Sequence, residues 1–309
     1  MQNWNHTQFE SPTGASIRLY SIAAKDKARG VVHVLHGLGE HAARYQRFAE
    51  SLSDAGYHVY AHDHRGHGAT TASDAPIGVF SNKDGWQKVI GDIDAINQHI
   101  REQHSDLPSI LFGHSMGSIA AFNYALQHPG KIDALCCWNA GFPTGALPMV
   151  GSAILKIERM FKGGDVPSQI TRKLTFDAWN GEFKPNRTEF DWLSRDEAEV
   201  DLYVADPLCG FPISVSMWLD VMSGVYFAAD DKNLAALPKD LPVNLLAGAE
   251  DPCTEKGKGV EQINARLRKI GMSDVTLKIL QDTRHESLNE INRDVTVAGF
   301  IEWLDQRFK

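Results

Sequence analysis

A serine between two glycines is the first place where this sequence could carry out covalent chemistry. Residues 113–117 read Gly-His-Ser-Met-Gly, which fits the pattern G-x-S-x-G. A strand is predicted just before it, at Ile110–Phe112, and a helix just after it, at Met116–Gln127. This context is typical of a nucleophile elbow, a strained turn that needs small residues on both sides. We therefore predict Ser115 as a nucleophile, in an elbow formed with Gly113, His114 and Gly117.

A serine hydroxyl is a poor nucleophile by itself, so a base must lie within hydrogen-bond reach of it. In proteins with this elbow the order along the chain is serine, acid, histidine. Twelve of the thirteen histidines lie at or before His128, and only His285 is far enough along to follow an acid. It lies in a loop, residues 281–286, after a predicted strand at Val275–Leu280. His285 is therefore the predicted base.

The acid that orients this histidine is predicted to be Asp251. It lies in the loop that follows a predicted strand at Val243–Ala247, and sites of parallel sheets are built at such strand ends. Glu250 and Asp282 are the competitors, and Asp282 is so close to His285 along the chain that a role in the loop itself suits it better. Asp251 would accept a hydrogen bond from the histidine ring and stabilise the imidazolium without being protonated.

An oxyanion hole needs two backbone N–H groups aimed at the developing negative charge. One comes from the residue after the nucleophile, Met116. The second is predicted at Leu38, because the strand Val31–Leu35 is followed by a loop whose glycines let the backbone approach a substrate. Each donor contributes about 2 to 4 kcal/mol of transition-state stabilisation. The other residues of this predicted oxyanion loop are His36, Gly37 and Gly39.

Three histidines, His62, His64 and His67, lie within six residues and raise the alternative of a metal site. A di-zinc motif of the form H-x-H-x-D-H needs an aspartate where this chain has Gly66. The run also follows a predicted strand, at His58–Ala61. We therefore expect a turn held by polar side chains, and no metal.

The elements that must position these residues alternate along the chain between short apolar strands and helices. The strands named above, with another at Ala134–Trp138, predict an α/β fold with a mostly parallel sheet. Further helices are predicted at Ala43–Ala55 and Trp86–His104, and residues 7–9 and 16–21 predict an antiparallel hairpin at the sheet edge. A final amphipathic helix would present Val297, Ile301, Leu304 and Phe308 on one face.

The alternation breaks between Phe142 and Phe227, where aromatic and methionine-rich helical segments replace the strands. We interpret residues 142–227 as an inserted helical cap between two parts of one core, residues 1–141 and 228–309. Most of its large apolar side chains, among them Trp179, Trp192 and Phe161, are expected to fill the core of the cap itself.

The amino-acid composition and net charge limit the kinds of molecule that this chain is expected to bind. With 43% hydrophobic and 23% charged residues among 309, the chain should fold around one large core. The net charge of −8 comes without a Lys/Arg block, so a nucleic-acid partner is not expected. The N-terminus does not resemble a secretory leader, and no apolar run approaches the roughly 18 residues of a spanning helix. We expect a cytoplasmic protein, with peripheral lipid contact through the cap left open.

Three motifs in this order resemble the monoglyceride lipase and lysophospholipase branch of the α/β-hydrolases, which also contains S33-type serine aminopeptidases. They are H-G-L-G-E-H-A-A-R-Y from His36, A-H-D-H-R-G-H-G from Ala61 and L-F-G-H-S-M-G from Leu111. The resemblance returns in the loops that contain Asp251 and His285. Departures from the family pattern are Ser118, where the family usually has glycine, and Ala69-Thr70 after G-H-G.

The resemblance implies an eight-stranded sheet with a helical cap, a triad of Ser115, Asp251 and His285, and an oxyanion amide from the residue after H-G. It also implies the absence of any cofactor and a carboxylic ester substrate with one acyl chain, such as a monoacylglycerol or a lysophospholipid. The motifs cover residues 30–130 and the two later loops, whereas the cap shows little that can be matched.

Two other functions remain open on the same scaffold. An aminopeptidase would need cap carboxylates to hold a free amine, and five are available: Glu182, Glu189, Asp191, Glu197 and Glu199. A ligand-binding protein without activity is the second. Enzymes of this fold that use an aspartate nucleophile are excluded by Ser115.

Overall fold

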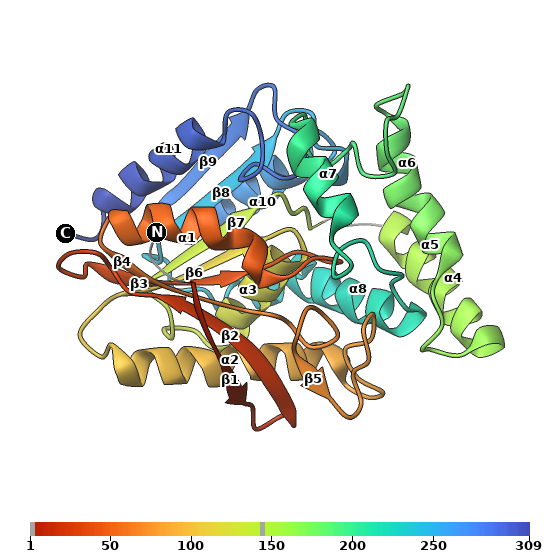
Figure 1. Cartoon of the computed structure of the whole chain (residues 1–309), viewed down its shortest axis with the longest axis horizontal. Coiled ribbons are helices and arrows are strands. Elements are labelled where there is room, and N and C mark those ends of the chain that lie inside the picture. Colours follow the sequence, from red (N-terminus) through yellow and green to blue (C-terminus); the bar gives the residue numbers. More distant parts are fainter. Residues whose placement is uncertain (1–3, 143–145) are drawn as a thin grey trace.

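The computed structural model describes residues 4–142 and 146–309, and its centre is one twisted sheet (Figure 1). The order of the strands across the sheet is β1-β2-β4-β3-β6-β7-β8-β9, and the two-residue strand β5 pairs with β2 outside this path. The strands are β1 (Asn5–Glu10), β2 (Ala15–Ile22), β3 (Gly30–Leu35), β4 (Tyr57–His62), β5 (Thr71–Ala72), β6 (Ser109–His114), β7 (Ala134–Trp138), β8 (Val243–Gly248) and β9 (Val275–Leu280). Strands β1 and β2 form the predicted antiparallel hairpin, and every pair from β4 to β9 along the path is parallel. The predicted α/β fold with a mostly parallel sheet is confirmed.

Helices cover both faces of the sheet, so the central strands β3, β6, β7 and β8 are fully buried, whereas the edge strand β1 is exposed. The helices are α1 (Gln46–Asp54), α2 (Gly85–Gln103), α3 (Met116–Gln127), α4 (Ala146–Lys162), α5 (Gln169–Leu174), α6 (Phe176–Gly181), α7 (Glu197–Ala205), α8 (Val215–Ala229), α9 (Asp231–Leu234), α10 (Lys258–Lys269) and α11 (Arg293–Asp305), with short 3-10 helices η1 (Ala42–Tyr45) and η2 (Pro252–Thr254). Two hydrophobic cores lie on the two faces of the sheet, and successive residues of β6 point alternately into one and the other. Ile110 and Phe112 pack with α1 and α11, whereas Leu111 packs with α2, α3, α8 and α10.

The four apolar residues predicted on one face of the last helix all contact the core. Leu304 is fully buried, and Val297, Ile301 and, just beyond the end of α11, Phe308 are partly buried and pack against the same cluster. The buried aromatic residues are Phe300 and Trp303, and the Phe300 ring packs edge-on against Trp138 at a centroid distance of 5.3 Å. The helix is turned toward these rings because burying large aromatic side chains contributes most to its packing energy.

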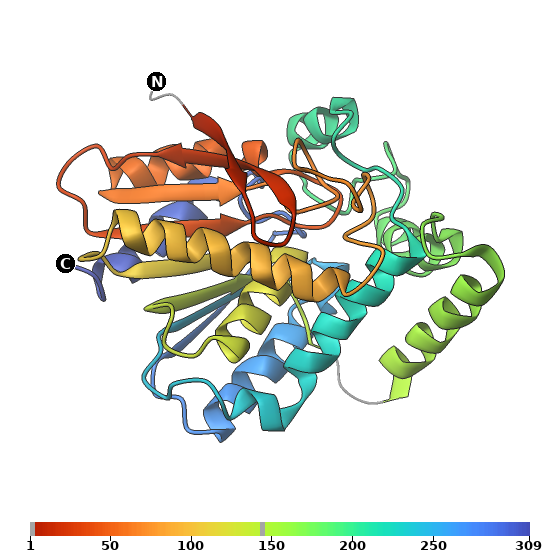
Figure 2. The ribbon, with the colours of Figure 1, turned by 90° about the horizontal axis from the view of Figure 1, so that it is seen from below.

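The segment between β7 and β8 is helical, as expected. Helices α4, α5 and α6, drawn in green, lie together at one end of the sheet (Figure 2). Helix α8 is different, because it packs against the core helices: the Asn123 side chain of α3 donates to the Gly224 carbonyl oxygen at 2.9 Å. The division of the chain at residues 142 and 227 stays a prediction, and α8 is the part of that range that contacts the core.

Strand register brings the predicted site residues to one edge of the sheet. Leu35 at the end of β3 lies beside Gly113 of β6, so the loops that carry Leu38 and Ser115 are neighbours. Gly248 of β8 likewise pairs with Leu280 of β9, which places the loops of Asp251 and His285 side by side. All four loops follow the carboxyl ends of parallel strands, where sites of such sheets form. Within the described part of the chain, no helix combines the length and apolar character needed to cross a membrane.

Candidate active site

Ser115 lies at a sharp turn between β6 and α3. Its backbone φ is 54° and its ψ is −120°, a conformation that residues other than glycine rarely adopt. A Cβ atom at Gly113 would overlap the Gly117 carbonyl, and one at Gly117 would overlap the carbonyl oxygen of Leu35. Both positions therefore require glycine, and the turn has the geometry of the predicted elbow.

Ser118, where the motif departs from the family pattern, braces this turn. Its Oγ lies 2.6 Å from the Gly113 carbonyl oxygen and accepts a hydrogen bond from the Trp138 backbone N–H at 2.8 Å. The Ser115 N–H donates in turn to the Trp138 carbonyl oxygen at 2.9 Å. The elbow is thereby tied to the end of β7, a role that only the folded neighbourhood of Ser118 reveals.

His285 and Asp251 face each other at the ends of β9 and β8. The Nδ1 atom of His285 lies 3.0 Å from each carboxylate oxygen of Asp251. Asp251 is fully buried, and it also accepts hydrogen bonds from the Cys253 N–H at 2.9 Å and the Thr254 hydroxyl at 3.1 Å. A carboxylate held in this way can also accept a hydrogen bond from an Nδ1–H of His285, the tautomer in which Nε2 is an acceptor.

The two competing acids have other surroundings. A carboxylate oxygen of Glu250 lies 3.9 Å from Nε of Arg284. Asp282 has a φ of 49°, which fits a residue that forms the turn of its loop.

The predicted cap supports the loop that carries His285. The Trp192 ring packs against the His285 ring at a centroid distance of 4.7 Å, and the Glu286 N–H donates to the Leu193 carbonyl oxygen at 2.7 Å. The buried carboxylate of Glu290 accepts from the backbone N–H groups of Arg195 and Arg284. The position of the candidate base therefore depends on residues 192–195, which the sequence pattern does not mark as part of the site.

The predicted oxyanion loop is equally constrained. His36 is buried, and its Nδ1 donates to the Gly37 carbonyl oxygen at 2.8 Å while its Nε2 accepts from the His64 N–H at 2.9 Å. The Gly37 N–H donates to the Glu40 carboxylate at 2.6 Å and is therefore engaged. The next amide, that of Leu38, and the amide of Met116 in the first turn of α3 belong to residues that line the same cavity as Ser115.

The histidine run after β4 forms a buried turn. Its Asp63 carboxylate accepts from the Ala42 and Ala69 N–H groups, each at 2.8 Å, as expected for a turn held by polar side chains. Burial lowers the pKa of His67 to about 4, and it lowers those of the neighbouring His33 and His36 to about 3. Among the described residues, two groups of three side chains lie close enough together to share a metal ion. They are His41, Asp206 and Cys209, and Asp251, Cys253 and His285. Neither group includes His62, His64 or His67.

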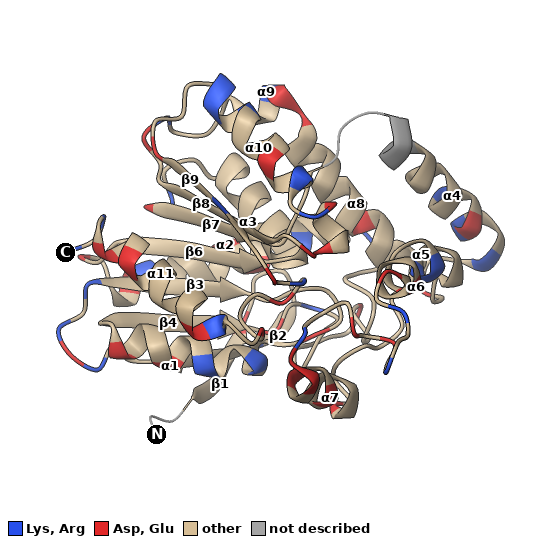
Figure 3. Ribbon diagram, turned by 90° about the horizontal axis from the view of Figure 1, so that it is seen from above, with Lys and Arg blue, Asp and Glu red and all other residues tan. Residues whose placement is uncertain are grey.

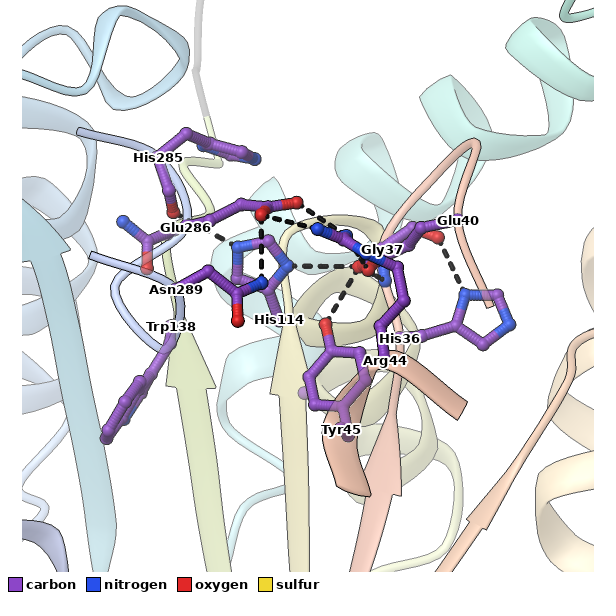
Figure 4. Close-up of polar contacts among 12 residues, drawn as sticks. His36, Gly37, Glu40, Arg44, Tyr45, His114, Trp138, His285, Glu286 and Asn289 are labelled. Carbon is purple, nitrogen blue, oxygen red and sulfur yellow. Dashed lines mark hydrogen bonds and ion pairs between the residues drawn. The ribbon is translucent and has the colours of Figure 1, made fainter. Parts of the chain in front are cut away.

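A cavity of about 210 Å³ opens above Ser115. It is bounded by the elbow and oxyanion loop on the core side and by aromatic and aliphatic side chains on the other side. The apolar residues of its wall are Leu38, Met116, Ile119, Phe176, Trp179, Trp192, Leu193, Phe190, Trp218, Val221, Met222 and Val225. Two carboxylates that were not predicted as site residues, Glu40 and Glu286, lie at its edge, joined by Arg44 (Figure 4).

Comparison with known proteins agrees with this geometry. The model of the family described as serine aminopeptidase, S33, matches residues 26–292. Human monoglyceride lipase is 28% identical over 299 residues, covering 90% of this chain and 83% of its own, and the monoacylglycerol lipase of Mycolicibacterium smegmatis is 26% identical over 281 residues, covering 89% and 88%.

Solved structures give the same relationship. A thermostable carboxyl esterase from Bacillus coagulans, solved in complex with glycerol, superimposes with a TM-score of 0.89 at 26% identity and 98% coverage of both chains. The monoacylglycerol lipase of Paleococcus ferrophilus superimposes with a TM-score of 0.70 at 26% identity, covering 93% of this chain and 98% of its own. The fold is that of the α/β-hydrolases.

Proposed function

This chain belongs to the serine aminopeptidase S33 family, and we propose that it hydrolyses carboxylic esters with a single acyl chain, such as monoacylglycerols or lysophospholipids. The observation that carries the proposal is the position of Ser115 at the floor of a cavity with an apolar wall, beside the His285–Asp251 pair. The relatives named as monoglyceride lipases and the esterase solved with glycerol support the same substrate class.

In this proposal, His285 takes the proton of the Ser115 hydroxyl as the oxygen attacks the ester carbonyl carbon. The negative charge that develops on the carbonyl oxygen is stabilised by the amides of Leu38 and Met116. The alcohol leaves with the proton that His285 returns, and an acyl group remains on Ser115. Water then attacks the acyl-enzyme with His285 again as base, and the fatty acid is released.

The apolar wall of the cavity predicts a preference for longer acyl chains. Each buried methylene contributes about 0.8 kcal/mol, so kcat/KM should rise from acetate esters to medium and long chains. One cavity above Ser115 holds one chain, so triacylglycerols should be poor substrates.

The aminopeptidase alternative finds less support in the cap. None of the five carboxylates considered for amine recognition is among the residues that line the cavity. Glu182 is paired with Lys256, Glu189 with Arg172 and Glu199 with Arg47. Asp191 accepts hydrogen bonds from Thr188, and Glu197 lies 3.8 Å from Arg187.

A hydrolysis panel tests the proposal. Monoacylglycerols, lysophospholipids, acetate esters and alanyl and prolyl arylamides would be compared by kcat/KM. We expect the single-chain lipid esters to be cleaved fastest, and faster cleavage of an arylamide than of any ester would overturn the assignment. Labelling by a fluorophosphonate probe, with Ser115→Ala as control, separates an enzyme from a ligand-binding protein, since only an activated serine reacts.

We also propose that the cap meets the surface of the lipid aggregate through α4. Val150, Ile157, Met160 and Phe161 recur on one side of this helix, and all four are exposed, Phe161 by 83%. Lys156, Arg159 and Lys162 lie on the same helix, which is basic although the chain is acidic overall (Figure 3). An exposed apolar stripe on a helix that also carries basic side chains can bind anionic lipid surfaces.

A further inference from the structure

Four charged or titratable side chains form a buried group beside the candidate triad (Figure 4). The Arg44 guanidinium lies 2.6 Å from Glu40 and makes a two-pronged contact with Glu286, at 2.6 and 2.7 Å. His114, the residue before the proposed nucleophile, lies against the other carboxylate oxygen of Glu40, Oε1, whereas Arg44 contacts Oε2. All four side chains are nearly inaccessible to solvent.

The two carboxylates of this group are ionised. Glu40 accepts hydrogen bonds from the Gly37 N–H, the Tyr45 hydroxyl and Arg44, and Glu286 accepts from Arg44 and the Asn289 side chain. Burial is the largest single influence and opposes ionisation, but Arg44 and His114 together outweigh it and hold the pKa of Glu40 well below its usual value and that of Glu286 below its own. Two negative charges and one guanidinium leave a buried excess of one negative charge, which is costly unless a second cation balances it.

The ring of His114 is placed to supply that cation. Its Nδ1 lies 3.4 Å from the Glu40 carboxylate, and its Nε2 lies 3.1 Å from the carbonyl oxygen of His285. A carbonyl oxygen can only accept a hydrogen bond, and so can an ionised carboxylate. A neutral imidazole would turn a lone pair toward one of these two oxygens, whereas an imidazolium donates to both.

We propose that His114 is an imidazolium and acts as a positioning residue, which links the oxyanion loop to the loop that carries His285. Through Glu40 it reaches the Gly37 N–H, one residue before the proposed oxyanion donor Leu38. Through its other nitrogen it holds the backbone of the base itself. The two halves of the proposed catalytic apparatus therefore share one proton-dependent connection.

Other groups around His114 agree with this charge state. Burial lowers its pKa, but the hydrogen bond to Glu40 and the charges of Glu40 and Glu286 outweigh burial and raise the pKa above the ordinary value. The remaining neighbours are Tyr45, whose hydroxyl donates to Glu40, and the ring of His285, at a centroid distance of 5.0 Å. Arg44 is the opposing positive charge, and it is held between the two carboxylates.

Loss of this proton at alkaline pH would break one of the two links. Because misplacement of a catalytic group by about 1 Å can lower the rate about a hundredfold, kcat should fall while KM changes little. This alkaline decrease rests on the proposed function, but the protonation of His114 does not. The two can therefore be tested separately.

The direct test is heteronuclear NMR of the Ser115→Ala protein with histidine labelled by nitrogen-15. The signals of residue 114 are assigned by comparison with the Ser115→Ala/His114→Gln protein. We expect both ring nitrogens of His114 to carry protons at neutral pH and to lose one only in the alkaline range. A neutral ring at neutral pH, with one unprotonated nitrogen, would refute the proposal whether or not the chain is an esterase.

The kinetic test uses Glu40→Gln, which removes a charge but keeps an oxygen that can accept from Gly37 and Tyr45. Loss of a neighbouring opposite charge should move the alkaline decrease of kcat to lower pH by about one unit or more. His128→Gln, at the residue that follows the far end of α3, is the matched control and should leave the profile unchanged. An alkaline decrease that stays in place in Glu40→Gln, with circular dichroism showing a folded protein, would count against the link.

Discussion

At the scale of single residues, the positive φ of Ser115 determines what each neighbour can be. The turn leaves no space for a side chain at Gly113 or Gly117, and it exposes the serine at the floor of the cavity. The proposed nucleophile and the strained backbone therefore lie at the same turn. Substitutions of Ser115 test the chemistry, and substitutions of the neighbouring glycines test the backbone.

Ser115→Ala and His285→Ala should each lower kcat by about a million-fold, because nucleophile and base act as a unit. Ser115 would lose only a hydroxyl, and the space left by the His285 ring would join the existing cavity, so both proteins should keep the wild-type circular dichroism spectrum. The measurement is kcat with a monoacylglycerol. If either variant kept a tenth of the wild-type rate, that residue would have to be removed from the proposed triad.

Gly117→Ala should destabilise the fold, since the added methyl group would overlap the carbonyl oxygen of Leu35. Overpacking of this kind lowers the free energy of unfolding by about 1 to 3 kcal/mol, which urea denaturation measures. Gly151→Ala is the matched control, because nothing lies within contact distance of a methyl group there and the residue is inside α4. The control should raise stability by about 0.5 to 1 kcal/mol, and equal effects at both positions would show that the elbow tolerates a side chain.

The proposed triad of Ser115, Asp251 and His285 could be predicted from the sequence because each residue follows a recognisable strand, and chain order left few alternatives. The bracing by Ser118 could not, since it depends on the approach of β7, which is distant in the sequence. Arg44 and Glu286 are separated by 242 positions, so their pairing is likewise a property of the folded chain.

At the scale of elements, the turn after β4 gathers neutral histidines in the core. Burial lowers the pKa values of His62 and His64 well below the ordinary range, and His33, His36 and His67 behave similarly. In the unfolded chain these histidines bind protons near the ordinary pKa of about 6.5, whereas in the folded chain they stay neutral at that pH. Their contribution to stability is therefore complete above that pH and is lost as the pH falls toward about 3 to 4.

We expect the free energy of unfolding to fall steeply between about pH 7 and about pH 5, by roughly 1 to 2 kcal/mol for each such histidine. Urea denaturation at several pH values measures the slope. His64→Gln should reduce it, because both ring nitrogens of His64 are buried without a hydrogen-bond partner and only its titration is removed. His6→Gln, on the exposed strand β1, should leave the slope as it is, and an unchanged slope in His64→Gln would contradict this account.

Strands were easier to predict than the faces of helices. β7 and β9 have the predicted bounds because their apolar runs are short and continuous. For α11 the predicted apolar residues contact the core, but their pattern does not indicate that Phe300 and Trp303 are the large side chains buried beside them. The aromatic cluster of Phe112, Trp138 and Phe300 decides this only in three dimensions.

At the scale of the whole molecule, the apolar stripe of α4 faces away from the rest of the protein. Ser152, Leu155 and Glu158 on the other side of the helix are buried. The aromatic residues predicted to fill the cap therefore divide: Trp179 and Trp192 pack together at a centroid distance of 4.9 Å, whereas Phe161 is exposed.

Phe161→Ser should weaken binding to vesicles that contain anionic lipid, because it removes apolar area that would enter the headgroup region. Sedimentation with the vesicles measures binding, and hydrolysis of a water-soluble ester should be unaffected. Ile291→Ser is the matched control, since Ile291 is also exposed but lies outside the cap, in the loop before α11. Equal loss of binding in both variants would mean that α4 has no special contact with lipid.

The contacts between residues 192–210 and the core also determine which segments of this chain can be exchanged with those of a relative. The Gly39 carbonyl oxygen accepts from the Tyr203 hydroxyl and the Gly210 N–H, each at 2.8 Å, while the Leu193 carbonyl holds the loop of His285. A chimera that exchanged residues 142–227 as a whole would therefore replace the contacts that support the oxyanion loop and the loop of His285. It would also replace most of the apolar wall of the cavity. Exchange of residues 146–181 alone would keep those supports. Of the apolar wall residues named above, that shorter exchange would alter Phe176 and Trp179 alone, whereas the longer graft would have to bring its own core loops with it.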